Sequence, residues 1–169
     1  MIELKDGAQV HTRPILPEDE PILVDLFRRL SPETIYQRFH APLSQLSPGM
    51  AHHLASVDAS KRMALIAESG SSVIGVARYE ATEDPAVVEL ALVVLDEWQD
   101  RGLGRVLLRE IIAAAEQRGI HHFRADVLAE NRRMLQLITT EGDIYDRKIE
   151  AGAVTLFFRP RQASKHHLG

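Results

Sequence analysis

The 169-residue sequence predicts a single α/β domain that carries an anion-binding loop past the middle of the chain. One observation is residues 87–95, a run dense in β-branched and large apolar residues, which favours a buried strand. A second is residues 103–116, where apolar side chains recur at the spacing of an amphipathic helix. The third is the glycine-containing stretch between them, residues 99–104. A strand that turns through glycines into a helix leaves backbone N–H groups unpaired at the positive end of the helix dipole, which suits a phosphate or pyrophosphate.

The elements before this strand follow from local patterns. Residues 10–14 are expected to form the first strand, and a helix is expected to begin after Asp19 as its N-cap. Prolines at three positions between residues 31 and 60 predict only short helical pieces there. Residues 63–67 and 72–79 predict two strands joined by a short glycine-containing turn.

The elements after the amphipathic helix are predicted in the same way. Residues 123–128 favour a strand, and Asn131 is expected to open a second helix with apolar residues on one face. Residues 144–149 and 154–158 predict two strands that the pair Ala151-Gly152 joins as a hairpin.

Two better-known phosphate loops do not fit the stretch 99–104. A Walker A loop ends in Gly-Lys-Ser/Thr, but Gly104 is followed by Arg105 and Val106. A dinucleotide fingerprint needs a third glycine at the position of Leu107, and it belongs to the first βα unit of a domain. The sequence therefore excludes these two classes of nucleotide site.

The stretch instead resembles the Gln/Arg-x-x-Gly-x-Gly/Ala loop of the GNAT superfamily of acyl-CoA-dependent N-acyltransferases, which Gln99, Gly102 and Gly104 match. An ordinary βα turn would explain a bare Gly-x-Gly, but the resemblance runs through almost the whole chain. It implies one GNAT-like domain over residues 1–159, with a central, mostly antiparallel, twisted sheet, a splayed strand pair and helices on both faces. Residues 160–169 would form a C-terminal tail that we expect to be flexible.

Composition narrows the function classes. The formal net charge of -4 argues against a general nucleic-acid binder, and no apolar run is long enough to span a membrane. The N-terminus does not look like a signal peptide, so the cytoplasm is the expected location. Without cysteine there is no thiolate metal ligand, and adjacent pairs such as His52-His53 lack the spacing of helical zinc ligands. We therefore expect no metal, nucleic acid or membrane as a partner.

Acyl transfer from a thioester to an amine makes two physical demands. The amine must lose its proton, because a lysine with an ordinary pKa of ~10.4 is only about one part in two thousand neutral at pH 7. The thioester oxygen must be stabilised as negative charge develops on it in the tetrahedral intermediate. A base and a set of N–H donors therefore suffice, and no enzyme nucleophile is needed.

Glu89 is the candidate base. It lies within the apolar strand 87–95, where a buried carboxylate is costly to keep charged and is suited to accepting a proton near neutrality. Exposure at the start of the strand, or an ion pair with an arginine, is the alternative. The resemblance favours the base, since many GNAT enzymes carry a glutamate at this point. Three nearby acids are rivals that we expect at a turn and facing solvent: Glu80, Glu83 and Asp84.

The resemblance also implies acetyl-CoA as the co-substrate and gives positions for its contacts. Main-chain N–H groups late in the strand would bind the pantetheine arm and the thioester carbonyl, at Leu92, Val93, Val94 and Leu95. The loop that would hold the pyrophosphate comprises Gln99, Asp100, Arg101, Gly102, Leu103, Gly104 and Arg105. Asn131 is a CoA contact by resemblance and equally a helix N-cap by physics. Where many GNAT enzymes have a tyrosine as general acid, this chain has Ile138.

Residues 31–39 and 61–67 are similar to bacterial protein lysine acetyltransferases of the Pat type. Tyr36, Arg38 and Phe39 are therefore candidates for the acceptor side, although core contacts and a structural arginine explain them equally well. The leading prediction is an acetyl-CoA-dependent N-acetyltransferase that acts on a primary amine, with protein lysine as the favoured acceptor. A small-amine acetyltransferase and a non-catalytic acyl-CoA sensor are the alternatives, and the oligomeric state is left open.

Overall fold

The computed structural model describes residues 1–58 and 60–161. Its strands are β1 (Ile2–Glu3), β2 (Gln9–Pro14), β3 (Arg62–Ser69), β4 (Ser72–Ala81), β5 (Val87–Val94), β6 (His122–Leu128), β7 (Gly142–Glu150) and β8 (Ala153–Pro160). Its α-helices are α1 (Glu20–Arg29), α2 (Pro32–Phe39), α3 (Pro48–Ala55), α4 (Leu103–Glu116) and α5 (Arg132–Glu141). Each strand and helix predicted from the sequence is present, whereas the two-residue β1 is too short to produce a pattern.

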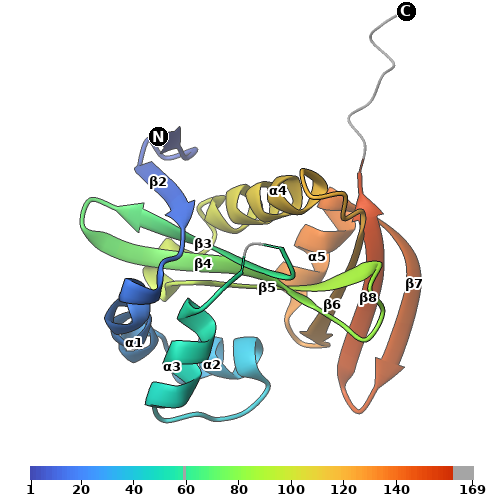
Figure 1. Ribbon diagram of the computed structural model, residues 1–169, viewed down its shortest axis with the longest axis horizontal. Helices are drawn as coiled ribbons and strands as arrows, with labels where there is room; N and C mark the ends of the chain where they lie inside the picture. Colours follow the sequence, from blue (N-terminus) through green and yellow to red (C-terminus); the bar gives the residue numbers. More distant parts are fainter. Residues whose placement is uncertain (59, 162–169) are drawn as a thin grey trace, which may run out of the picture.

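One sheet forms the centre of the molecule, in the order β1-β2-β3-β4-β5-β6-β8-β7 (Figure 1). Every neighbouring pair is antiparallel except β5 and β6, which are parallel. Parallel neighbours need a crossover connection, and α4 provides it between these two strands. The predicted single α/β domain with a mostly antiparallel sheet is confirmed.

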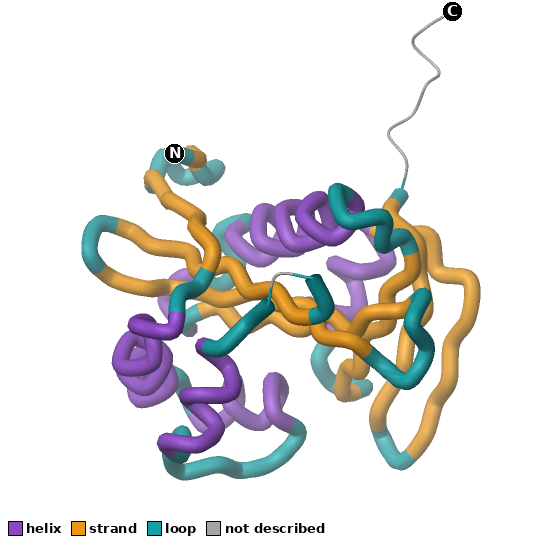
Figure 2. Tube along the Cα trace, viewed as in Figure 1, coloured by secondary structure: helices purple, strands orange, loops and turns teal. Residues whose placement is uncertain are grey.

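Helices cover both faces of the sheet, as predicted. In Figures 1 and 2, α4 and α5 lie on one side of the strands, and α1, α2 and α3 lie on the other. The α4 helix packs closely because β4 has Gly75 beneath it, where a Cβ atom would meet Leu107 at 3.0 Å. Leu103, Leu107 and Ile111 of α4 are consequently buried against the sheet. This contact places the N-terminal end of α4 next to the end of β5.

Three local expectations are changed by the structure. Asp19 precedes α1, but its carboxylate does not cap the helix: it accepts hydrogen bonds from Arg13 at 2.8 and 2.9 Å and from the Leu16 N–H at 2.7 Å. Glu80 lies within β4 and not at the expected turn, and its side chain is partly exposed (36%). The strand β8 extends through Pro160, and the part of the expected tail from residue 162 onward lies outside the described residues.

Among the helices of the described ranges, none is long and apolar enough to cross a membrane.

Candidate active site

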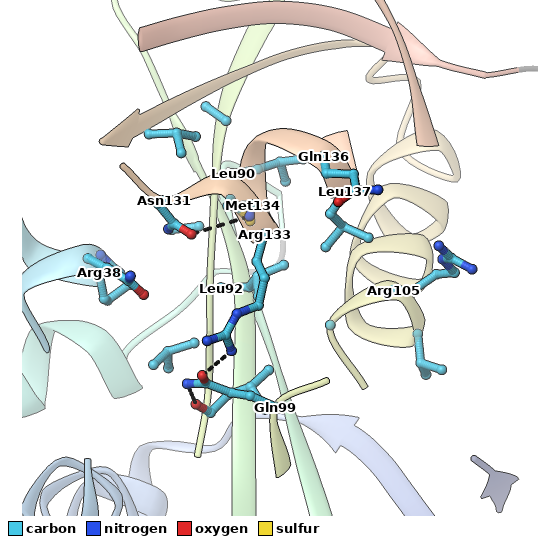
Figure 3. A pocket seen from close by; sticks show the side chains of 18 of the residues that line it. Arg38, Leu90, Leu92, Gln99, Arg105, Asn131, Arg133, Met134, Gln136 and Leu137 are labelled. Atoms are coloured by element: carbon cyan, nitrogen blue, oxygen red, sulfur yellow. Dashed lines mark hydrogen bonds between the residues drawn. The ribbon is translucent and has the colours of Figure 1, made fainter. Parts of the chain in front are cut away.

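The parallel strands β5 and β6 pair over three positions only and then separate. Val87, Val88 and Glu89 pair with residues 122–124, and the rest of β5 has no strand partner on that side. A cavity of about 780 Å³ opens along this gap, bordered by both strands, the end of α2, the start of α4 and the start of α5 (Figure 3). The predicted splayed strand pair is therefore present, and it exposes backbone polar groups of β5 to the cavity.

The N-terminus of α4 borders the cavity without a side-chain cap. Its N-cap is Gly102, with φ +89°, a left-handed conformation that glycine adopts at little cost. Ser31, Ser47 and Asn131 each cap their own helices by accepting a backbone hydrogen bond, but Gly102 has no side chain to do so. The first N–H groups of α4 are therefore left for an external acceptor, and an anion is the favoured one.

Arginines surround this helix N-terminus. Arg101 lies against the Trp98 ring at 3.9 Å and contacts Asp6 at 2.5 Å. Arg105 lies 3.0 Å from a carboxylate oxygen of Glu141. Their positive charge adds to that of the helix dipole and suits a ligand with several negative charges.

Arg133, which the sequence did not single out, reaches the same loop from α5. It donates a hydrogen bond to the side-chain carbonyl of Gln99, and its Nε lies 3.6 Å from the carboxylate of Asp100 (Figure 3). The sequence feature that could have indicated Arg133 is its position two residues after Asn131, because the helix that begins there would border the loop.

Gln99 connects three elements through its side chain. Its Nε2 donates to the Val94 carbonyl of β5 at 3.0 Å and to the Thr34 hydroxyl of α2 at 3.1 Å, while its Oε1 accepts from Arg133 of α5. Both N–H bonds of the amide are thus directed to protein partners. The side chain of Gln99 fixes the shape of the loop, and the residue borders the cavity.

Asp96 holds the start of α2 against the segment that follows β5. Its carboxylate accepts from the N–H and hydroxyl of Ser31 at 2.9 and 2.6 Å and from the hydroxyl of Thr34 at 2.9 Å. Burial alone would raise the pKa of Asp96, but the hydrogen bonds from Ser31 and Thr34 outweigh it and lower the pKa below its ordinary value. This network joins the helix that carries the acceptor-side candidates to the loop around Gln99.

Glu89 borders the cavity, but its surroundings differ from those expected. Its side chain is 38% exposed, and its Oε2 accepts from Nη2 of Arg124 at 2.9 Å. The expected apolar burial is therefore wrong, and the alternative of an ion pair is what the structure has. Glu80 lies directly opposite in the β4–β5 register, on the same face of the sheet, and contacts Nη2 of Arg62 at 3.3 Å.

Two of the three acceptor-side candidates border the cavity. Phe39 packs on Phe27 with ring centroids 5.8 Å apart, and the Arg38 guanidinium lies 4.8 Å from the centre of the Phe39 ring. Tyr36 is 42% exposed and is not among the residues that line the cavity.

The cavity brings together most of the site residues predicted from the sequence: Arg38, Phe39, Glu89, Leu92, Val93, Val94, Gln99, Asp100, Arg101, Gly102, Gly104, Arg105 and Asn131. Leu95 and Leu103 do not line it, because Leu95 donates its N–H to the Ile74 carbonyl at 2.8 Å and the Leu103 side chain of α4 is buried against the sheet. Asn131 serves as the N-cap of α5, accepting from the Met134 N–H at 3.3 Å.

Two further observations concern groups that could take part in the chemistry. Ile138, at the position where many GNAT enzymes have a tyrosine, is fully buried. No group of three or more His, Cys, Asp or Glu side chains within the described ranges is arranged to hold a metal ion.

Comparison with known proteins gives consistent matches over most of the chain. The model of the acetyltransferase (GNAT) family matches residues 23–140. Acetyltransferase PA5475 of Pseudomonas aeruginosa is 32% identical over 148 residues, which cover 85% of this chain and 80% of that protein. Acetyltransferase Pat of Mycolicibacterium smegmatis is 27% identical over 150 residues, which cover 87% of this chain and 45% of that protein.

Solved structures show the same fold. The GNAT domain of S. lividans PAT has a TM-score of 0.87 and 34% identity, with 94% of each chain covered. The yncA protein of Salmonella typhimurium, solved with acetyl-CoA, has a TM-score of 0.70 and 17% identity, with 93% of this chain and 95% of that one covered.

Proposed function

The chain belongs to the GNAT family of acetyltransferases, and from that premise we propose that it transfers the acetyl group of acetyl-CoA directly to a primary amine, with Glu89 as general base and protein lysine as acceptor. The observation that carries the proposal is the cavity between β5 and β6, which is bordered both by the uncapped N-terminus of α4 and by Glu89. A phosphate-bearing thioester and an amine can therefore meet in one space. That the yncA structure holds acetyl-CoA supports the same donor here.

The donor would be held by backbone and basic groups. The free N–H groups at the start of α4, with Arg105 and Arg133 beside them, suit its pyrophosphate. The backbone of β5 at residues 92–94 has no strand partner toward the cavity and suits the pantetheine arm and the thioester oxygen. The N–H of Leu95 is excluded from this role because the Ile74 carbonyl accepts it.

Glu89 would take the proton of the incoming amine, directly or through one water. The amine nitrogen forms a bond to the thioester carbon, the C–S bond breaks, and the displaced thiolate takes a proton from water, since position 138 is an isoleucine. Arg124 donates a hydrogen bond to Oε2 of Glu89 at 2.9 Å and so holds the carboxylate in place beside the cavity. Glu80, although opposite Glu89, does not line the cavity and is therefore the weaker candidate.

The choice of protein lysine rests on the similarity of the α2 region to Pat-type enzymes and on the match to the GNAT domain of S. lividans PAT. The direct test measures CoA release from acetyl-CoA with a panel of small amines and with a lysine-containing protein. Lysine acetylation detected by mass spectrometry above the uncatalysed background is expected. If one small amine alone is modified efficiently, that amine and not protein lysine is the acceptor. If acetyl-CoA binds but no CoA is released, the non-catalytic acyl-CoA sensor is favoured.

A further inference from the structure

Arg38 differs from the other arginines that border the cavity. Arg101, Arg105, Arg109 and Arg133 each lie within 4 Å of a carboxylate, on Asp6, Glu141, Glu141 and Asp100 respectively. Arg38 makes no ion pair and no hydrogen bond with the residues that the structure describes; its one close partner is the face of the Phe39 ring. A guanidinium carries five N–H donors in a fixed fork, so those of Arg38 are available to a ligand.

Arg38 is half-buried, and part of its surroundings is apolar. Arg38, Phe39 and Val93 also border a small, mainly apolar hollow of about 40 Å³ between α1, α3 and the sheet. Burial lowers the pKa of Arg38, against the effect of Glu80 and Glu89. Burial also lowers the pKa of the neighbouring Arg78 to about 10, and the positive charge of Arg38 contributes to that shift. An unpaired cation in such a setting is costly, and a bound anion would remove much of that cost.

The two nearby carboxylates are already committed to other arginines. Glu89 pairs with Arg124 at 2.9 Å, and Glu80 lies within 4 Å of Arg62 and Arg78. Neither carboxylate reaches Arg38. An anion that pairs directly with Arg38 would therefore come from a ligand.

Arg38 is also badly placed for the phosphates of the donor. It lies at the end of α2, on the face of the sheet opposite α4. In Figure 3, Arg38 and Arg105 lie on opposite sides of the cavity, with Leu92 and Arg133 between them. The ligand that reaches Arg38 is accordingly the acceptor, which approaches Glu89 from the same face of the sheet.

Resting on the proposed function, we propose that Arg38 binds a carboxylate carried by the acceptor, so that the enzyme prefers an amine with a carboxylate nearby. In a protein this is a lysine flanked by Asp or Glu, and in a small molecule it is an amino acid with a free α-carboxylate. A charge-assisted, two-pronged contact from the guanidinium fork would hold the carboxylate while the amine lies at Glu89. The same charge would disfavour lysines in strongly basic segments.

The experiment uses two lysine peptides that differ only by Glu or Gln beside the lysine. Wild type should show a kcat/KM at least about tenfold higher for the Glu peptide, since a hydrogen-bonded charge pair contributes about 1.5–3 kcal/mol and each 1.4 kcal/mol is tenfold. Arg38→Gln should bring that ratio close to one, whereas Arg147→Gln, which removes an exposed charge on β7, should leave it unchanged. A second arm compares free lysine with lysinamide and separates the two sources of the carboxylate.

Binding of the same fluorescent peptides to the CoA-saturated protein gives a readout that does not depend on turnover. If wild type binds the Glu peptide more tightly and Arg38→Gln abolishes that preference, the inference is supported. This holds even if neither peptide is acetylated, and in that case only the proposed lysine acceptor is wrong. Equal use and equal binding of both peptides and both small amines by wild type would overturn the inference. So would a preference that Arg38→Gln leaves intact.

Discussion

Placing a negative charge at the start of α4 tests the donor site directly. In Gly104→Glu the new Cβ atom meets only the Leu137 side chain, at 3.5 Å, which is an ordinary contact, so the fold should accept the substitution. The carboxylate would compete for the free N–H groups and repel the pyrophosphate. One pair of unit charges about 6 Å apart at an effective dielectric constant of about 20 repels by about 3 kcal/mol, which corresponds to an affinity roughly a hundredfold lower.

The measurement is calorimetric titration with acetyl-CoA, with two matched variants at the same position. Gly104→Gln adds similar bulk without charge, so its affinity for acetyl-CoA should lie between the affinities of Gly104→Glu and wild type. The affinity of Gly104→Ala should lie within a few-fold of wild type. Added salt should narrow the difference between Glu and Gln, because the Debye length is about 10 Å at 0.1 M and shortens at higher ionic strength. If folded Gly104→Glu binds acetyl-CoA as tightly as wild type, the pyrophosphate does not lie at this helix N-terminus.

Three further predictions concern the base and the buried polar groups. Glu89→Gln should keep its affinity for CoA but lower turnover by about 10²–10⁴-fold at pH 7. The loss should be smaller at high pH, because more of the amine is neutral there. A kcat/KM near that of wild type at pH 7 would remove Glu89 from the mechanism. Thr34→Val should lower the free energy of unfolding by about 1–3 kcal/mol in denaturant titrations, because Asp96 and Gln99 each lose a buried partner; an unchanged midpoint would contradict this. The hydrogen bond and charge of Arg13 lower the pKa of Asp19, so the stability this pair provides is present above the ordinary carboxyl range and is lost as pH falls through the lowered value. Asp19→Asn should therefore be less stable at pH 7 and lose less stability on acidification, and parallel curves for the two proteins would refute the assignment.

The sequence predicted the elements well because each has a strong local pattern. The apolar run of β5 and the helical spacing of α4 identify a buried strand and an amphipathic helix without knowledge of the rest of the chain. The stretch 99–104 between them could likewise be placed at the mouth of a site, since its position follows from the two elements that it joins.

Partners far apart in sequence could not be predicted in this way. The environment of Glu89 depends on Arg124, which lies on the parallel strand β6 and is brought alongside only by the α4 crossover. The N–H of Leu95 is not available to a ligand because it donates to the carbonyl of Ile74, on the antiparallel neighbour β4. Arg133 contacts Gln99 across 34 residues, and no local periodicity encodes that contact.

The network of Ser31, Thr34, Asp96 and Gln99 has a consequence for how this domain can change in evolution. Asp96 accepts three hydrogen bonds from the first turn of α2, and Thr34 accepts one from Gln99. Replacing one member leaves another with an unsatisfied polar group, whereas replacing them together with apolar residues need not. The hydrogen-bonded partners across the two segments lie 62 to 65 residues apart. These four positions are therefore expected to change together among homologues, so that sequences carry matched combinations of residues and rarely mixed ones.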